Sequence, residues 1–391
     1  MHIPDAVLSP ATCVVAGAAM LPVWAIAGRG VRQSLGTRQV PLLSLGAAFC
    51  FTIMMFNIPA LGGTTAHPVA GTLLAVMLGP CAACIGVSVA LAIQALFFGD
   101  GGLLAYGANC FTMAFVLPFV GYTVYQLLAR HTSMQAPGRA VCAGIGAYIG
   151  LNAAAAVVAV VLGIQPALFH EANGHALYFP FGLRITLPAM LSTHLLIAGP
   201  VEAIVTVLVV RYMQAAGIPL WGDHNTLIPT TLSTSPRSSK WRGSGLWIGL
   251  LALIALSPLG LLAKGDAWGE WDKAGLAKQI ELTEGKGKAY IPKGVADREE
   301  HGYKGIAGLQ DYAGASGAKG YLGAGALGVG AIVLLLWIGG RLLARPEESP
   351  DTQVSEPGEA ERINAASTAA GDLPTWLRRS SEDMPPSDKP D

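Results

Sequence analysis

Charged residues are scarce in this chain. Only 13% of its 391 residues are Asp, Glu, Lys or Arg, whereas 52% are apolar, and the mean hydropathy is +0.49. The 25 basic residues balance 25 acidic ones, so no overall positive field predicts a nucleic-acid partner. Few soluble domains carry so little charge, and the composition predicts a polytopic protein embedded in a lipid bilayer.

Motifs for catalysis and nucleotide binding are also missing. The string GxxxxGK[ST] does not occur, so any ATP hydrolysis would have to come from separate subunits. HExxH does not occur either, and the HExxxH formed by His170, Glu171 and His175 has the wrong spacing to place both imidazoles on one helical face. Cys81 and Cys84 form a CxxC inside an apolar run, where cysteine usually acts as a small apolar residue. An intramembrane metalloenzyme is therefore only a remote alternative.

Long apolar runs are present instead, and they predict an all-α polytopic membrane protein with a seven-helix core and two additional transmembrane helices. The predicted helices are 8–28, 41–57, 67–79, 81–98, 108–129, 140–163, 185–211, 245–263 and 321–340. The third ends at Gly79 and Pro80 and is too short to cross ~30 Å of hydrocarbon at about 1.5 Å per residue. We expect it to continue a re-entrant loop that is buried in protein.

The positions of Lys and Arg predict the orientation. Basic residues gather in alternate connections, which places the N-terminus outside and the C-terminus in the cytoplasm of a multi-pass protein of the inner (plasma) membrane. The outward loop 264–320 breaks the pattern with nine basic and nine acidic residues, but long loops translocate largely regardless of charge. The polar, acidic tail 342–391 is predicted to be a disordered cytoplasmic segment.

The chain opens with MHIPDAVLSP, which lacks the charged and apolar regions of a secretory signal. A histidine in second place offers three nitrogens in a row: the amine of Met1, the deprotonated amide of His2 and the imidazole of His2. They close a five-membered and a six-membered chelate ring and fill three corners of a square plane, a geometry that favours Ni(II) or Cu(II). The fourth corner requires a residue from elsewhere.

Seven histidines could supply that fourth nitrogen: His67, His131, His170, His175, His194, His224 and His301. His67 lies in GGTTAHPVAG, where an outward connection enters the short third helix and Pro68 suits a first helical turn. Broken backbone at an outward cavity is where membrane transporters place substrate sites. His67 is therefore the leading candidate, while His170 and His175 in another outward connection stay open.

Four ordered stretches within residues 1–212 resemble the CbiM/NikM family, the substrate-binding membrane subunits of energy-coupling factor (ECF) transporters for nickel and cobalt. They are MHIPDAVLSP, which resembles the family's MHIPDGFLSP, NIPALGGTTAHPVAGTLLAVMLGP, FFGDGGLLAYGANCFTMAFV and THLLIAGPVEAIVT. The resemblance implies that Met1, His2 and His67 hold a transported Ni(II) or Co(II), with no cofactor. It also implies a membrane coupling subunit (T component) and ATPase subunits (A components) as partners. Ala6 departs from the family's usual glycine and removes no ligand.

Four further polar residues match the family motifs: Asp100, Asn109, His194 and Glu202. Polar groups inside a membrane are costly unless they are paired. The resemblance therefore implies that these residues support the ligands or gate the site, with purely structural pairing as an equal alternative.

Residues 245–341 resemble the two-span NikN/CbiN or PDGLE-like partner subunit, here fused in frame. AWGEWDKAGL and YIPKG carry this resemblance, although the string PDGLE itself is absent. The expected organisation is a metal-binding core at 1–212, a cytoplasmic linker at 213–244, the two-helix unit at 245–341 and the tail. The sequence leaves open whether the metal is nickel, or cobalt serving cobalamin synthesis. It also leaves open the order of metal loading and the stoichiometry of the complex.

Overall fold

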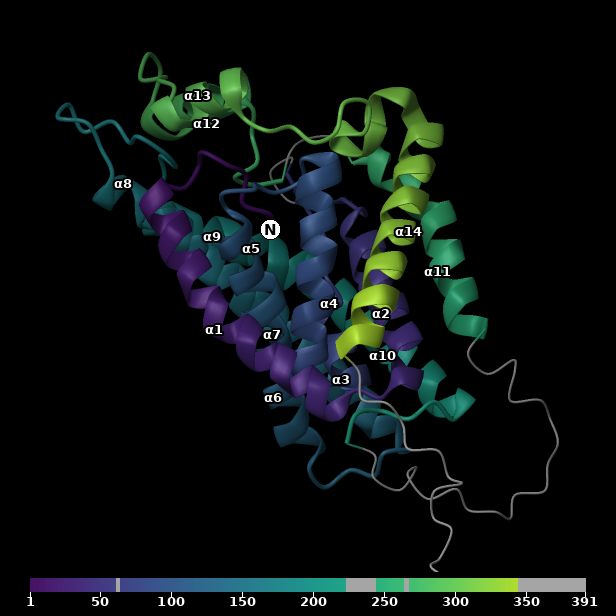
Figure 1. The fold of residues 1–391 in the computed structure, drawn as a ribbon. Coiled ribbons are helices and arrows are strands. Elements are labelled where there is room, and N and C mark those ends of the chain that lie inside the picture. Colours follow the sequence, from purple (N-terminus) through teal and green to yellow (C-terminus); the bar gives the residue numbers. More distant parts are fainter. Residues whose placement is uncertain (61–63, 223–243, 264–266, 344–391) are drawn as a thin grey trace, which may run out of the picture. The chain divides into compact units, whose positions relative to one another are not determined.

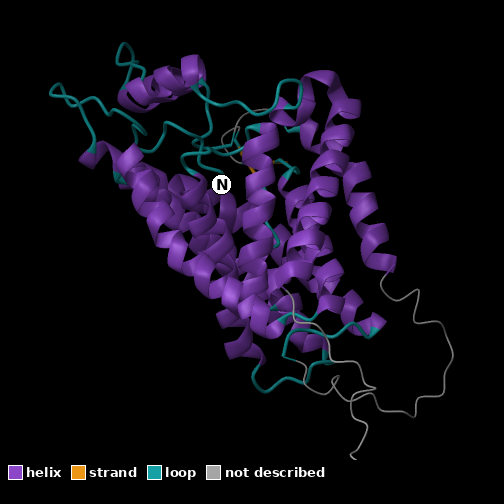
Figure 2. Ribbon diagram, viewed as in Figure 1, coloured by secondary structure: helices purple, strands orange, loops and turns teal. Residues whose placement is uncertain are grey.

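The computed structural model describes residues 1–60, 64–222, 244–263 and 267–343. Their regular secondary structure is almost entirely helical, with long loops between some of the helices (Figure 2). Seven helical segments in this part of the chain are long and apolar enough to cross a membrane, and α2 is a shorter apolar helix. The predicted all-α polytopic class is therefore confirmed.

The helices fall into three groups. Seven α-helices form the main parts of the membrane-length segments: α1 (Pro10–Ser34), α4 (Pro80–Ile93), α6 (Leu117–Ala129), α7 (Pro137–Gly163), α10 (Gly199–Ala216), α11 (Ser244–Leu256) and α14 (Gly317–Leu343). The other α-helices are α2 (Val40–Met54), α3 (Gly71–Leu78), α5 (Tyr106–Asn109), α8 (Gln165–Leu168), α9 (Leu183–Thr193), α12 (Lys273–Glu284) and α13 (Lys293–His301). The 3₁₀ turns are η1 (Thr37–Gln39), η7 (Ser257–Leu262) and η8 (Gln310–Ser316).

Local sequence signals set several helix ends. Ser9 caps α1 by accepting a hydrogen bond from Thr12 N at 3.1 Å, and Pro10 occupies the first helical position. Gly79, at φ +88°, separates α3 from α4, which begins at Pro80. α10 continues past the predicted end at 211 to Ala216 and stops at a left-handed Gly217.

Helix α3 does not cross a membrane by itself, as the sequence predicts. All of its residues are buried, and an extended, largely buried segment leads into it. That segment contains the short hairpin of β1 (Ile58–Pro59) and β2 (Thr65–Ala66) and ends at Ala70, which is left-handed at φ +62°. His67 lies between this hairpin and α3.

Three π-helical segments interrupt the long helices. They are η2 (Gln94–Phe98), η3 (Cys110–Val116) and η4 (His194–Ala198). Each begins at, or directly after, a buried polar side chain, namely Gln94, Asn109 and His194. Such bulges often mark functional sites. The three segments here place polar groups within the apolar helices or at their ends.

The segment 264–320, predicted as the outward connection between the two additional spans, contains helices that the sequence analysis did not predict. They are α12, α13 and η8. Asp272 caps α12 by accepting from Gly275 N at 2.6 Å, and Leu276 and Ile280 form its buried face. A polar helix with only two buried apolar residues has too little hydrophobicity for an apolar-run search to detect. Most of the predicted linker and tail lie outside the described residues.

The two additional helices pack on the core (Figure 1). α14 runs along α2, where Gly328 lies against Phe51 and Gly340 against Val40. The Tyr321 hydroxyl donates to Met55 O at 2.6 Å. Residues 1–345 cluster as one compact unit, so elements of 244–343 can contribute directly to a site in the core.

Candidate metal site

The N-terminus is buried among the helix ends (Figure 1). Met1, His2 and Ile3 are 3%, 5% and 0% exposed. Asn109 holds the main chain of Ile3 from both sides: its Oδ1 accepts from Ile3 N at 2.8 Å and its Nδ2 donates to Ile3 O at 3.0 Å. Gly102 N donates to the same carbonyl at 3.0 Å. Residue three is therefore fixed, and the two residues before it are directed inward.

Asp5 and Ala6 complete the turn that follows. The Asp5 carboxylate accepts from Leu103 N at 2.9 Å and from Ala105 N at 3.0 Å. Ala6 has φ +72°, a left-handed conformation that glycine adopts without steric cost and alanine does not. This geometry gives a physical reason for glycine to be favoured at this position.

The terminal amine and His67 meet at the centre of the site. The Met1 nitrogen lies 3.2 Å from His67 Nε2, and the imidazole rings of His2 and His67 stack with centroids 4.8 Å apart. His67 Nδ1 donates to Pro68 O at 3.2 Å, which leaves Nε2 as the acceptor. Burial, and then the positive amine and His2, hold the pKa of His67 well below 6.5. A neutral imidazole with a free lone pair is the form that binds metals.

His2 lies between an acid and an amide. Its Nδ1 is 3.3 Å from Asp100 Oδ1, and its Nε2 is 3.2 Å from Gln94 Oε1. Gln94 also donates to the Tyr312 hydroxyl at 2.9 Å, and that hydroxyl donates to Asp100 Oδ2. Burial, and then Asp100, raise the pKa of Tyr312 well above 10, so the hydroxyl remains a donor. The four side chains form a closed ring of contacts that orients the His2 imidazole.

Glu202 supports the site by binding main-chain N–H groups close to His67, rather than by contacting a candidate ligand. Its Oε2 accepts from Val69 N at 2.7 Å and from Ala70 N at 2.9 Å. These N–H groups lie at the N-terminal end of α3, where they have no carbonyl partner within the helix. A carboxylate at this end also complements the helix dipole. Glu202 therefore fixes the turn that directly follows His67 and Pro68.

Among the described residues, no hydrogen bond joins any of the other histidines to the Met1 amine. His194 Nδ1 contacts Met190 O at 2.7 Å, and its buried Nε2 has no hydrogen-bond partner among the described residues. His175 is exposed and stacks on Tyr290 with centroids 4.2 Å apart. His170 is exposed beside Pro166 O. His131 and His301 are exposed as well, and His224 lies outside the described residues.

Sequence reasoning missed three residues of the site: Gln94, Glu270 and Tyr312. Glu270 Oε1 lies 3.5 Å from the Met1 nitrogen. Burial raises the pKa of Glu270, and the amine opposes that change. Gln94 could have been suspected as an amide inside an apolar run, whereas nothing in the sequence places 270 and 312 beside residue 1.

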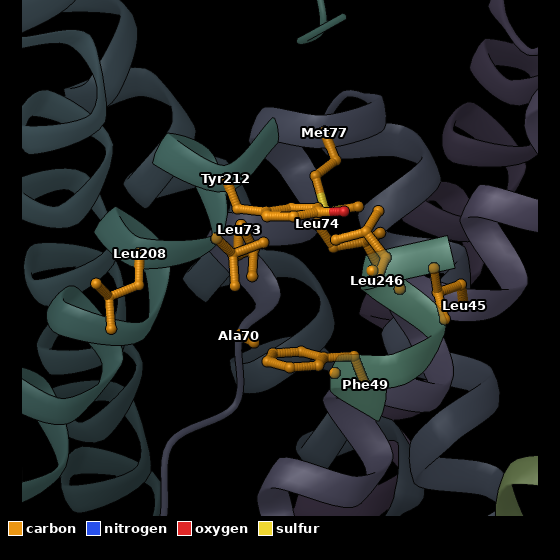
Figure 3. Close-up of a pocket in the computed structure, with 13 residues that line it drawn as sticks. Leu45, Phe49, Ala70, Leu73, Leu74, Met77, Leu208, Tyr212 and Leu246 are labelled. Atoms are coloured by element: carbon orange, nitrogen blue, oxygen red, sulfur yellow. The ribbon is translucent and has the colours of Figure 1, made fainter. Parts of the chain in front are cut away.

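A cavity of about 360 Å³ opens at this cluster and is lined by residues from the core and from the additional unit, including His2, His67, Asp100, Glu270 and Tyr312. Its size admits a metal ion with water around it. A second cavity, of about 230 Å³, is apolar and lies between Phe49, Leu73, Leu74 and Tyr212 (Figure 3). The second cavity lacks the donors that a metal ion needs.

The donor set is unusual in its chemistry. Within the described ranges, no group of three His, Cys, Asp or Glu side chains is placed to hold a metal ion. The four nitrogens that could do so are the Met1 amine, the His2 amide, the His2 imidazole and His67 Nε2, and two of these belong to the main chain. Nitrogen donors arranged in a plane suit Ni(II).

Comparison with known proteins identifies the two parts of the chain. Residues 2–219 match the model of the CbiM family, described as the cobalt uptake substrate-specific transmembrane region, and residues 242–345 match the PDGLE domain. A probable fused nickel transport protein, LarMN, from Lactiplantibacillus plantarum is 46% identical over 80% of this chain and 89% of its own length. The fused nickel transport protein NikMN of Rhodobacter capsulatus is 44% identical over 85% of this chain and 95% of its own.

Solved structures agree with this assignment. The crystal structure of a truncated transition metal transporter superposes with a TM-score of 0.52 and 53% identity, covering 55% of this chain and 99% of that one. The family match spans more than half of the sequence and includes His2, His67 and Asn109 of the buried N-terminal cluster. The chain therefore belongs to the CbiM family of metal-transport membrane proteins and carries a PDGLE domain fused behind the family's transmembrane region.

Proposed function

We propose that this chain is the substrate-specific membrane component of an ECF-type importer, and that it captures Ni(II) or Co(II) through Met1, His2 and His67. The observation that carries the proposal is the 3.2 Å approach of the terminal amine to His67 Nε2, beside the stacked ring of His2. A buried amine next to a neutral imidazole has few structural uses, because burying a charged group is costly. Shared coordination of a metal ion accounts for the arrangement.

Binding requires the ion to replace protons. The amine and the His2 amide lose one each when they become ligands, so metal affinity depends on pH. His2 Nδ1 leaves Asp100 for the ion, gives up the proton through which it contacts that carboxylate, and closes the six-membered ring with the amide nitrogen. His2 Nε2 keeps its contact with Gln94, which holds the imidazole in the orientation that ligation needs.

Nickel is the better-supported cargo. Three nitrogens from two consecutive residues impose a square plane, which Ni(II) accepts readily. The fused relatives named above are nickel transport proteins, whereas the family description names cobalt. Cobalt uptake, for example in support of cobalamin synthesis, is the alternative, because Co(II) also binds nitrogen donors.

Energy for transport comes from other subunits in this proposal. The sequence contains no Walker A motif, so A components would hydrolyse ATP and a T component would couple them to this chain. The distribution of Lys and Arg supports an orientation with the metal site outward and the C-terminus in the cytoplasm of the inner membrane. The cavity at His2 and His67 would then receive the ion from outside.

Binding and uptake test the proposal separately. Purified full-length chain should bind one Ni(II), with weaker binding of Co(II), in equilibrium titrations. Cells should accumulate radioactive nickel only when this chain is expressed together with its coupling and ATPase subunits. Absence of nickel and cobalt binding would overturn the site, and uptake without any ATPase would overturn the ECF assignment.

A further inference from the structure

The motif Trp268-Gly269-Glu270-Trp271 belongs to the fused PDGLE domain, yet it lies at the metal site of the core. Directly before it, Ala267 pairs with Thr65 in a parallel bridge, two residues ahead of His67. Glu270 lies beside the Met1 amine. The additional unit therefore contacts both segments that carry the candidate ligand residues, the N-terminus with Met1 and His2 and the stretch with His67.

The two tryptophans anchor the motif on the core. Trp268 packs edge-on against Phe179 at 5.5 Å between centroids, and Trp271 packs edge-on against Phe181 at 6.0 Å. The tryptophans also contact each other at 5.3 Å. Gly269, at φ +93°, reverses the chain direction between the tryptophans, and Glu270 lines the cavity. Aromatic contacts of this kind fix a backbone firmly, so Glu270 has a defined position.

Glu270 lines the cavity, and its carboxylate forms an ion pair without a hydrogen bond to any described residue. Its Oε1 is buried, makes no hydrogen bond among the described residues, and lies 3.5 Å from the Met1 nitrogen. Within the described part of the chain, no hydrogen bond or ion pair joins Glu270 to His2 or His67. Glu270 therefore lies beside one of the four proposed nitrogen ligands, the Met1 amine.

We propose that Glu270 is a transfer ligand, which takes the hydrated divalent ion first and passes it to the Met1 amine. This inference rests on the proposed metal site and adds a step to it. A carboxylate oxygen binds a hydrated cation readily, because hard oxygen donors exchange with water ligands. The Glu270 oxygen–metal bond forms as one water leaves and breaks as the Met1 nitrogen–metal bond forms. The protons released by the amine and the His2 amide pass to water in the cavity.

A transfer ligand affects the rate of loading and leaves the loaded state unchanged. Once the four nitrogens close around the ion, Glu270 is no longer bound to it. Removing the carboxylate should therefore slow nickel loading while the equilibrium affinity and the absorbance spectrum of the loaded site persist. A permanent ligand would alter all three.

The test uses full-length protein and Ni(II) as its sulfate, mixed in a stopped-flow instrument and followed by absorbance. Glu270→Gln keeps the side-chain size and should lower the loading rate about tenfold or more, with the equilibrium affinity within about threefold of wild type. The matched control is Glu284→Gln, an exposed acid of α12 in the same unit, which should load at the wild-type rate. In Glu270→Ala, added acetate should restore part of the lost rate, whereas chloride should not.

Two results would overturn the proposal. One is loading of Glu270→Gln at the wild-type rate. The other is a changed spectrum with a loss of affinity comparable to that of His67→Ala, which would make Glu270 a permanent ligand. If Glu270→Gln does not fold, Glu270→Asp tests the transfer role instead. This change withdraws the carboxylate by one methylene and should slow nickel loading about threefold. An unchanged loading rate would refute the transfer role. Failure of the proposed metal site itself would be recognised differently, as absence of nickel binding by wild type.

Discussion

Asn109 binds Ile3 through both of its amide atoms, accepting from the Ile3 nitrogen at 2.8 Å and donating to the Ile3 oxygen at 3.0 Å. This pair joins the N-terminal segment to the start of the π-helical segment η3. It fixes the main chain one residue after His2. The positions of the His2 amide and the Met1 amine therefore depend on a side chain that is not itself a candidate ligand.

Asn109→Asp should weaken nickel binding although no proposed ligand is changed. The aspartate keeps the size of the side chain but cannot donate to the Ile3 oxygen. A carboxylate oxygen and the Ile3 carbonyl oxygen, both acceptors, would then face each other in a buried place. An unsatisfied buried group costs about 1–3 kcal/mol, so we expect affinity to fall about tenfold. Asn152→Asp is the matched control, because within the described part of the chain that side chain donates a hydrogen bond to Tyr148 O, inside its own helix α7, and not to the N-terminal segment. Equal losses in both variants would contradict a specific role of Asn109.

Inserting one residue between Met1 and His2 should abolish nickel uptake. Asn109 holds Ile3 in place, so the inserted residue moves the amine about 3.5 Å along the chain and out of its contact with His67 Nε2, while the histidine, now residue three, can chelate Ni(II) without His67. Titration of the purified variant with Ni(II) and radiometal uptake in cells would measure the effect. An insertion after Gly285, in an exposed turn of the additional unit, controls for general damage. Normal uptake by the N-terminal insertion variant would show that transport does not require the amine to lie beside His67.

His67→Ala should reduce nickel affinity more than His175→Ala does. His67 Nε2 faces the terminal amine in a buried site, whereas His175 is exposed and stacks on Tyr290. Loss of one in-plane nitrogen should cost more than about 1.4 kcal/mol, which is a tenfold change in the dissociation constant. The two variants would be compared by equilibrium titration under identical conditions. A larger loss in His175→Ala would show that the ligand assignment is wrong.

Those parts of the fold that depend on apolar runs could be predicted from the sequence. The long helices and the short, interrupted α3 follow from run length and from Gly79 and Pro80. Chelate chemistry at Met1 and His2 and the broken backbone at His67 made these residues candidates, and the family resemblance selected His67 over His170 and His175. In each case the signal lies within a few neighbouring residues.

Other features depend on contacts between distant residues, which a single sequence does not record. Glu270 and Tyr312 reach the site because the additional unit packs on the core. In the π-helical segments each backbone hydrogen bond spans one more residue than in an α-helix. No local sequence pattern distinguishes these segments from α-helix. α12 and α13 were missed because their exposed faces are polar, although the cap at Asp272 and the spacing of Leu276 and Ile280 were available as signals.

The additional unit contributes to the site without supplying a proposed nitrogen ligand. Tyr312 is 7% exposed and stacks on Phe98 with centroids 4.8 Å apart. It also contacts Gln94 and Asp100, the two residues that flank His2. Met1, His2 and His67 themselves all belong to the core. Binding and transport should therefore respond differently to removal of the unit.

Truncation after about residue 240 separates the two roles. The truncated core retains all four candidate nitrogens, so it should still bind Ni(II) at equilibrium, with affinity reduced about threefold to tenfold because Tyr312 no longer braces Gln94 and Asp100. Loading and uptake should fall much further, because Glu270 and the surface that the unit presents are both lost. Equilibrium titration of the purified core and radiometal uptake in cells would be compared with those of the full chain. If binding and uptake vanish together, the unit builds the site instead of serving it. If neither changes, the contacts of Glu270 and Tyr312 have no part in transport.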